Sequence, residues 1–135
     1  FNDKPVLGAD TIVVLPLGSG SDVLEKPKDK KQAIAMLMSL SDKQHRVITA
    51  VSICYHQRCE TRVSTSIVEF GSIDERTALR YWQTGEPVDK AGAYGIQGLG
   101  GVFARQIIGS YSAVVGLPLF ETSQLLTLFD IDYWQ

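Results

Sequence analysis

Two long runs of β-forming residues, separated by a short polar break, constrain the fold of this chain more than any other feature. Residues 47–55 and 60–70 are rich in Val, Ile and Thr, and His56-Gln57-Arg58 stands between them. Runs of this kind joined by a few polar residues predict a long antiparallel hairpin. The hairpin speaks against an entirely parallel sheet, while the alternation of strand-like and helical patterns along the chain is typical of the α/β class.

The two cysteines of the chain flank the break in this hairpin. With His56 they form a Cys-x-His-x-x-Cys pattern, but no second pair of ligands stands elsewhere in the sequence, so a metal site is a poor interpretation. Free thiols are the simpler interpretation in a cytosolic protein. Opposite positions across a hairpin would nevertheless bring Cys54 and Cys59 close together, so that pairing stays open.

Shorter patterns predict the remaining elements. Apolar periodicity, capping residues and glycine or proline breaks place them as follows: a strand over 6–15 that is buried on both faces, a flexible turn over 16–22, helices over 29–40, 72–83 and 122–129, a glycine-rich loop over 89–101, and strands over 102–108 and 112–115.

Asp10 interrupts the apolar strand over 6–15. A carboxylate inside a core strand costs several kcal/mol, by order of magnitude, unless a cation or hydrogen bonds compensate it. It is therefore either a buried aspartate satisfied by backbone donors or a metal ligand or general base.

Composition limits the classes of function. The chain has 135 residues, 44% of them hydrophobic and 21% charged, which predicts one globular domain over residues 1–135. A net charge of −2 without a block of Lys and Arg argues against a nucleic-acid polymer as partner. No apolar run approaches the roughly 20 residues of a membrane span, so we expect no membrane contact and a cytoplasmic location. Because the chain opens at Phe1 directly before a buried-type strand, we interpret its N-terminus as artificial.

The loop over 89–101 is the richest motif in the chain. Five glycines there allow close approach of backbone or ligand, yet they complete neither a G-x-G-x-x-G nor a P-loop pattern. Its DKAGAYGIQG, together with GAD-T at 8–11, EKP at 25–27 and GSYSAVVGLP at 109–118, resembles the Maf family of nucleoside triphosphate pyrophosphatases. The Tyr-Gly-Ile-Gln version is similar to the branch that acts on thymidine and uridine triphosphates. The family's initial strand and Ser-Gly-Ser-Pro-Arg-Arg phosphate loop have no counterpart in this sequence.

The resemblance implies an elongated α/β domain with a mixed, twisted sheet, flanking helices and a substrate cleft between two lobes. It implies hydrolysis of dTTP, UTP, CTP or modified pyrimidine nucleotides to monophosphate and pyrophosphate, in a house-cleaning role, with a homodimer as the expected assembly. The alternative, taken from the process for which the family is named, is a nucleotide-binding regulator of septum formation and cell division.

Site residues follow from the same resemblance and from chemistry. The positions of Asp10 and Lys26 are catalytic in the family, and those of Thr11 and Gln97 bear on substrate choice. Asp10 offers the hard oxygen that Mg²⁺ prefers, with Mn²⁺ and Co²⁺ as alternatives. By residue type, Lys26 and Lys90 suit phosphate charge, and the hydroxyls of Ser110 and Tyr111 suit further hydrogen bonds to the substrate. Without the resemblance, Thr11 would be an N-cap or strand hydroxyl, Gln97 a loop-stabilising amide and Lys26 a solvated surface charge.

Overall fold

The structure is a computed structural model that describes residues 3–134. Its centre is a five-stranded sheet in the order β2-β1-β3-β4-β5. The strands are β1 (Val6–Leu17), β2 (Gly20–Leu24), β3 (Gln44–Tyr55), β4 (Arg58–Phe70) and β5 (Ala104–Ile108). Every strand pairing in the described part of the chain is antiparallel, where we expected a mixed sheet. The α/β class and the flanking helices are confirmed.

The long hairpin is present and is formed by β3 and β4, which pair from Gln44↔Glu69 to Tyr55↔Arg58. The turn consists of His56 and Gln57, whose φ angles of +48° and +67° suit the two-residue turns that match the twist of a hairpin. Arg58 already belongs to β4, so the turn is shorter than the break in the sequence suggested.

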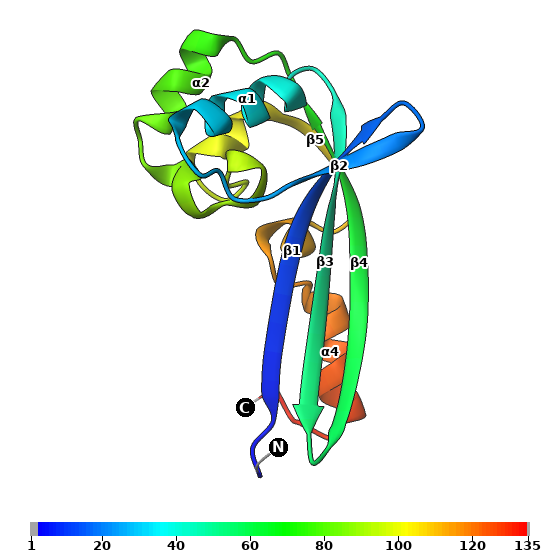
Figure 1. The fold of residues 1–135 in the computed structure, drawn as a ribbon. Helices are drawn as coiled ribbons and strands as arrows, with labels where there is room; N and C mark the ends of the chain where they lie inside the picture. Colours follow the sequence, from blue (N-terminus) through cyan, green and yellow to red (C-terminus); the bar gives the residue numbers. More distant parts are fainter. Residues whose placement is uncertain (1–2, 135) are drawn as a thin grey trace.

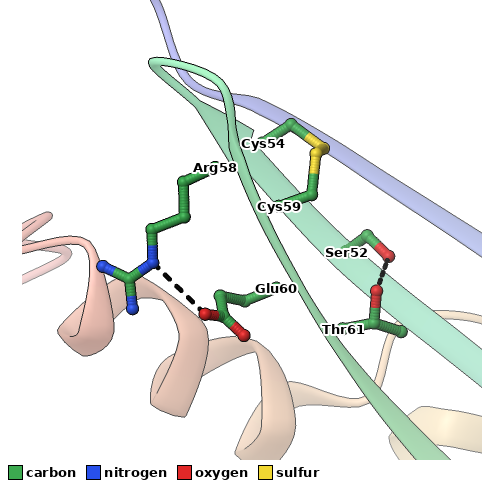
Figure 2. The surroundings of a disulfide bond; sticks show 6 residues. All are labelled: Ser52, Cys54, Arg58, Cys59, Glu60 and Thr61. Carbon is green, nitrogen blue, oxygen red and sulfur yellow. Dashed lines mark hydrogen bonds and ion pairs between the residues drawn. A yellow bond between two sulfur atoms is a disulfide. The ribbon is translucent and has the colours of Figure 1, made fainter.

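A disulfide joins Cys54 and Cys59 beside this turn, so of the two states that the sequence left open the structure has the paired one (Figure 2). A two-residue turn places the two cysteines directly opposite each other in the register, which brings their side chains together. Next to them, Arg58 pairs with Glu60 at 3.2 Å. The sulfur atoms are bonded to each other, so they are not metal ligands here.

The helices divide into two lobes along the sheet (Figure 1). The first lobe holds α1 (Lys30–Leu40), α2 (Glu75–Trp82) and the 3-10 turns η1 (Glu86–Asp89), η2 (Ala91–Ala93) and η3 (Leu99–Phe103). The second lobe holds α4 (Leu119–Leu128), and the short helix α3 (Tyr111–Val115) leads into it. Two separate cores match this division, a large one beneath α1 and α2 and a small one in which Leu125 packs on Val51 and Ile53.

Both lobes lie on the same face of the sheet. The odd-numbered residues of β3 from His45 to Ile53 are buried, whereas the even-numbered ones are exposed or half-buried. Val47 belongs to the first core and Val51 to the second. Because side chains alternate along a strand, Thr49 lies on this face between the two cores.

β1 differs from the expected strand that is buried on both faces. Only Val13, Val14 and Leu15 are buried, and residues 6–10 are exposed. β2 pairs with residues 13–17 alone, so among the described strands residues 6–12 have a single neighbour, β3. Because, within residues 3–134, one edge of this half of the strand is unpaired and its side chains are not covered by packing, residues 6–10 are exposed to solvent. Most of the expected turn over 16–22 is in fact the end of the β1–β2 hairpin, with Gly18 in its turn.

The segment predicted as a strand over 112–115 is the helix α3 instead. Ser110 caps it by accepting a hydrogen bond from the Ala113 amide, and Gly116, at a φ of +130°, ends it. α2 is capped by Asp74 and not by the predicted Ser72, and α4 begins at Leu119, earlier than predicted. No helix in the part of the chain described is long and apolar enough to cross a membrane.

Candidate functional site

A pocket of about 510 Å³ lies on the helix-covered face of the sheet, where the first lobe meets α3. Its walls come from β1, the connection between β2 and α1, β3, the segment from η1 to Gly98, and α3. Five of the seven residues predicted for the site line it: Asp10, Thr11, Lys26, Lys90 and Gln97. These residues come from three separate segments of the sequence, residues 10–11, residue 26 and the loop over 89–101, so their meeting is a property of the fold.

Thr11 is held on the floor of the pocket by a chain of hydroxyl groups. Thr49 lies opposite Thr11 in the register of β1 and β3, and their Oγ1 atoms are 2.9 Å apart. The Thr49 hydroxyl donates its proton to the Ala113 carbonyl at 2.7 Å. A hydroxyl has one proton to donate, so Thr11 must be the donor to Thr49. The lone pairs of Thr11 Oγ1 are therefore what it can offer to a ligand.

Asp10 lines the pocket at the open edge of β1. It is exposed, and one carboxylate oxygen accepts a hydrogen bond of 3.0 Å from the Thr11 amide. The expectation of a desolvated carboxylate in a core strand is wrong, because this half of β1 has only one neighbouring strand among residues 3–134. By strand alternation Asp10 leaves the pleat on the side opposite to Thr11, so it borders the pocket from the rim and not from the floor.

Two lysines supply positive charge to the pocket. Lys26 is exposed on the extended connection before α1, anchored by the buried Pro27, and makes no ion pair with the residues described. Lys90 lies between η1 and η2 and pairs with Asp89 at 3.7 Å. Lys26 therefore carries the less compensated charge of the two.

Gln97 lies on an exposed turn whose backbone is tied to two side chains that our sequence analysis did not identify. The Glu86 carboxylate accepts hydrogen bonds from the amides of Leu99 at 2.8 Å and Gly100 at 2.9 Å, and from the Tyr81 hydroxyl. The Tyr81 hydroxyl in turn accepts a bond of 3.0 Å from the Gly95 amide. The segment that carries Gln97 is thus fastened on both sides.

Electrostatics agree with a charged Glu86. Partial desolvation raises the pKa of Glu86, but the hydrogen bonds from Tyr81, Gly100 and Leu99 and the charge of Lys90 together outweigh it, so the pKa lies below its ordinary value. Burial, followed by the hydrogen bond to Glu86, raises the pKa of Tyr81. One member of the pair is consequently a carboxylate and the other a neutral phenol at neutral pH.

Behind the pocket, His45 is buried in the first core. Its Nε2 and the hydroxyl of Tyr94, a residue of the pocket wall, are 2.6 Å apart, and its Nδ1 has no hydrogen-bond partner among the described residues. Burial lowers the pKa of His45 from 6.5 to about 4. Burial also raises the pKa of Tyr94. The pocket therefore rests on a neutral imidazole and a neutral phenol.

Ser110 and Tyr111 are not brought to this pocket. The Ser110 hydroxyl is engaged as the cap of α3, where it accepts from the Ala113 amide at 3.1 Å. Tyr111 lines a separate groove of about 330 Å³ beside β5. The motif that contains both residues instead contributes Val114 and Val115 to the pocket.

The pocket fits a metal ion that is shared with a substrate, and it does not fit a cage made by the protein alone. Residues 3–134 contain no group of three or more His, Cys, Asp or Glu side chains placed to hold a metal. Mg²⁺ usually takes one or two carboxylates and completes its shell with water and substrate phosphates. The exposed carboxylate of Asp10 meets that requirement.

The sequence has clear relatives. A dTTP/UTP pyrophosphatase of Saccharophagus degradans is 52% identical over 131 residues, which cover 97% of this chain and 60% of the relative. Proteins of the same name from Hahella chejuensis and Alkalilimnicola ehrlichii are 49% and 50% identical, over 98% and 96% of this chain and 64% and 61% of their own lengths. The chain thus spans about three fifths of the length of the curated relatives it matches. The family described as Maf-like protein matches residues 1–129, and the chain belongs to this Maf family.

Proposed function

We propose that the complete protein containing this chain hydrolyses nucleoside triphosphates to monophosphate and pyrophosphate, with dTTP and UTP as its preferred substrates. The observation that carries the proposal is the pocket that gathers Asp10, Thr11, Lys26, Lys90 and Gln97 from three separate segments. The names of relatives about half identical to this chain support the same reaction and the same substrates.

The charges around the pocket suit phosphoryl chemistry. Lys26 and Lys90 offer cations to the triphosphate, and Asp10 lies in contact with solvent, where it can accept a proton from an attacking water molecule. A divalent ion, Mg²⁺ by preference, would be held by Asp10 together with the phosphates, and it would neutralise charge on the reacting phosphoryl group. Lys26 is the stronger candidate for the reacting phosphates because Asp89 already compensates Lys90.

Polar groups of the pocket suit a thymine or uracil edge. Thr11 offers lone pairs and no proton, because its proton is engaged by Thr49. Where it faces position 3 of the base, such an acceptor favours a pyrimidine that carries N3–H, as thymine and uracil do, over cytosine, whose N3 is itself an acceptor. The Gln97 amide both donates and accepts, so it can pair with a carbonyl and an N–H of one base.

We also propose a cytoplasmic location, where nucleoside triphosphates are made and consumed. Thiols are kept reduced there, so the Cys54–Cys59 pair would be open in the cell and closed after exposure to oxidant. The homodimer implied by the resemblance stays a prediction.

The test is pyrophosphate release by the complete protein across a panel of pyrimidine and purine triphosphates. Asp10→Asn should lower kcat on the best substrate by about 10²–10⁴-fold, which is the usual contribution of a positioned acid or base. Since Asp10 is exposed, the free energy of unfolding should change by no more than about 0.5 kcal/mol. Asp22→Asn, on the exposed part of β2, is the matched control and should leave both quantities unchanged. Turnover within a few-fold of the wild type would remove Asp10 from the mechanism, and nucleotide binding without any release of pyrophosphate would favour the regulatory alternative.

A further inference from the structure

The turn that carries Gln97 has no support from the Gln97 side chain itself. Gln97 is exposed, and its amide makes no hydrogen bond with the described residues. Its position is therefore set by the backbone on either side. On one side Gly95 donates to Tyr81, and on the other side Leu99 and Gly100 donate to Glu86.

These contacts form one connected network. The Gly95 amide donates to the Tyr81 hydroxyl, which donates to Glu86 Oε2, and Oε2 also accepts from the Gly100 amide. Oε1 accepts from the Leu99 amide. A carboxylate that receives three donors is bound more strongly than a neutral acceptor, since hydrogen bonds to an ionised group are roughly twice as strong as neutral ones. The Glu86 carboxylate thus holds one end of the Gln97 turn directly and the other end through the Tyr81 hydroxyl.

The glycines of this turn leave room for the same two side chains. A Cβ on Gly98 would lie 2.0 Å from Glu86 Oε1, and one on Gly100 would lie 2.5 Å from the Tyr81 hydroxyl oxygen. The φ of Gly98 is −102°, outside the left-handed region that favours glycine, so its close contact with Glu86 is the stronger reason for glycine there. Of the two uses that the sequence allowed for these glycines, close approach of backbone or of ligand, Gly98 and Gly100 serve the first, because the absence of a side chain lets the backbone close around an internal carboxylate.

We infer that Glu86 is a positioning residue, which sets substrate selectivity by holding the Gly95–Gly100 turn so that Gln97 faces the base of the bound nucleotide. This inference rests on the proposed function for its selectivity part. Its structural part, that the Glu86 carboxylate fixes the turn, does not depend on the proposed function. Glu86 comes from the segment after α2, so the network couples the turn to the packed helices of the first lobe.

The functional test compares Glu86→Gln with the control Glu75→Gln in the complete protein. Glu75 lies in the exposed first turn of α2 and is not part of the network. The amide of glutamine has one oxygen and would direct its NH₂ group at a backbone donor, so the turn loses part of its anchor. The ratio of kcat/KM for UTP to that for CTP should fall by about ten- to a hundredfold, the scale expected when a contact group is displaced by about 1 Å. A merely structural loss would lower both values together and leave the ratio unchanged.

A second measurement reads the turn without any substrate. In the wild type, the amide proton signals of Leu99 and Gly100 should shift with pH as Glu86 is protonated below its ordinary pKa, and in Glu86→Gln this titration should disappear. If Glu86→Gln does not fold, Tyr81→Phe removes the tie to Gly95 more mildly and should lower the same UTP to CTP ratio.

The outcomes are separable. A wild-type protein that releases no pyrophosphate refutes the proposed function and the selectivity part, while the amide titration still decides whether Glu86 holds the turn. If the amide proton signals of Leu99 and Gly100 do not shift as Glu86 is protonated, the inference that Glu86 holds the turn is overturned. A ratio that stays within twofold of the wild type in a folded Glu86→Gln protein overturns the selectivity part even where the amides titrate.

Discussion

Lowering the pH should destabilise this protein through His45, well before most of its carboxylates are protonated. His45 is buried against Phe70 and Tyr94, and its pKa falls from 6.5 to about 4 on folding. Between these values the unfolded chain binds more protons than the folded one, so stability rises with pH in that window. The contribution of His45 is complete above about pH 6.5 and is lost as the pH falls towards 4.

The magnitude follows from the two pKa values. With one pKa unit equal to about 1.4 kcal/mol, the contribution of His45 to the free energy of unfolding should fall by about 2 kcal/mol between pH 7 and pH 4.5. Nothing around the ring offsets this, because the hydroxyl of Tyr94 is its single hydrogen-bond partner among the described residues and Nδ1 has none. A proton added to the ring would therefore place a charge in the core without a partner for one of its two N–H groups.

The assay is urea denaturation of the complete protein at pH 7 and pH 4.5, for the wild type and for His45→Gln. Glutamine keeps a polar group near the Tyr94 hydroxyl but does not titrate, so the variant reports the pH dependence of all the other groups. The wild type should lose about 2 kcal/mol more than the variant over this interval. Equal losses in the two proteins would refute the assignment of this pH dependence to His45.

Three further predictions concern the pocket and the hairpin. Lys26→Ala should lower kcat/KM for triphosphates by about 10²–10³-fold, measured by steady-state kinetics, because it removes a cation that stabilises negative charge developing in the transition state. Monophosphate binding, measured by calorimetry, should weaken much less. Equal losses for both ligands would indicate that Lys26 attracts the ground state and the transition state alike. Gln97→Glu should change the ranking of bases more than the rate on the best substrate, since an ionised carboxylate accepts but does not donate; an unchanged ranking in the triphosphate panel would return Gln97 to a structural role. Opening the Cys54–Cys59 disulfide with a reductant should leave kcat unchanged, because the disulfide lies far from the pocket. Cys54 is paired with Val6 of β1, and Val6 is four residues, or about 13 Å, from Asp10 along that strand. A loss of activity in proportion to the thiols released would contradict this.

The parts of the fold that depend on local pattern were predictable from sequence. The hairpin of β3 and β4 was predictable because residues of high β-propensity, Val, Ile and Thr, fill the two runs over 47–55 and 60–70. The Tyr111–Val115 helix was mistaken for a strand because its two valines favour a strand, whereas a capping serine before it and a glycine after it decide the matter in the structure. Its five residues are too few for a helical period to appear in the sequence.

The site was predictable only where a motif carried it. Thr11 and Gln97 came from the motifs, yet the hydrogen-bond chain from Thr11 through Thr49 to the Ala113 carbonyl depends on the strand register, which the sequence alone does not state. Glu86 was missed because its partners are 13 and 14 residues away and are backbone amides, which leave no mark on residue type except at Gly98 and Gly100. For the two cysteines, free thiols were preferred because a reducing compartment was presumed. A two-residue turn at His56 and Gln57 would have placed Cys54 opposite Cys59 and so suggested the disulfide.

Because β3 runs without a break over its 12 residues beneath both lobes, the sheet itself is the mechanical link between the walls of the pocket. Domain-closing enzymes usually narrow their clefts by changing a few backbone angles at a hinge between separate bodies. Here, drawing the lobes together would require the whole ladder of β1, β3 and β4 to coil further, so the deformation is spread over many hydrogen bonds. We therefore expect the twist of the sheet to set the width of the pocket and to keep that width nearly constant when a ligand binds. Ligands would then be discriminated by small distortions of the sheet and not by large opening motions.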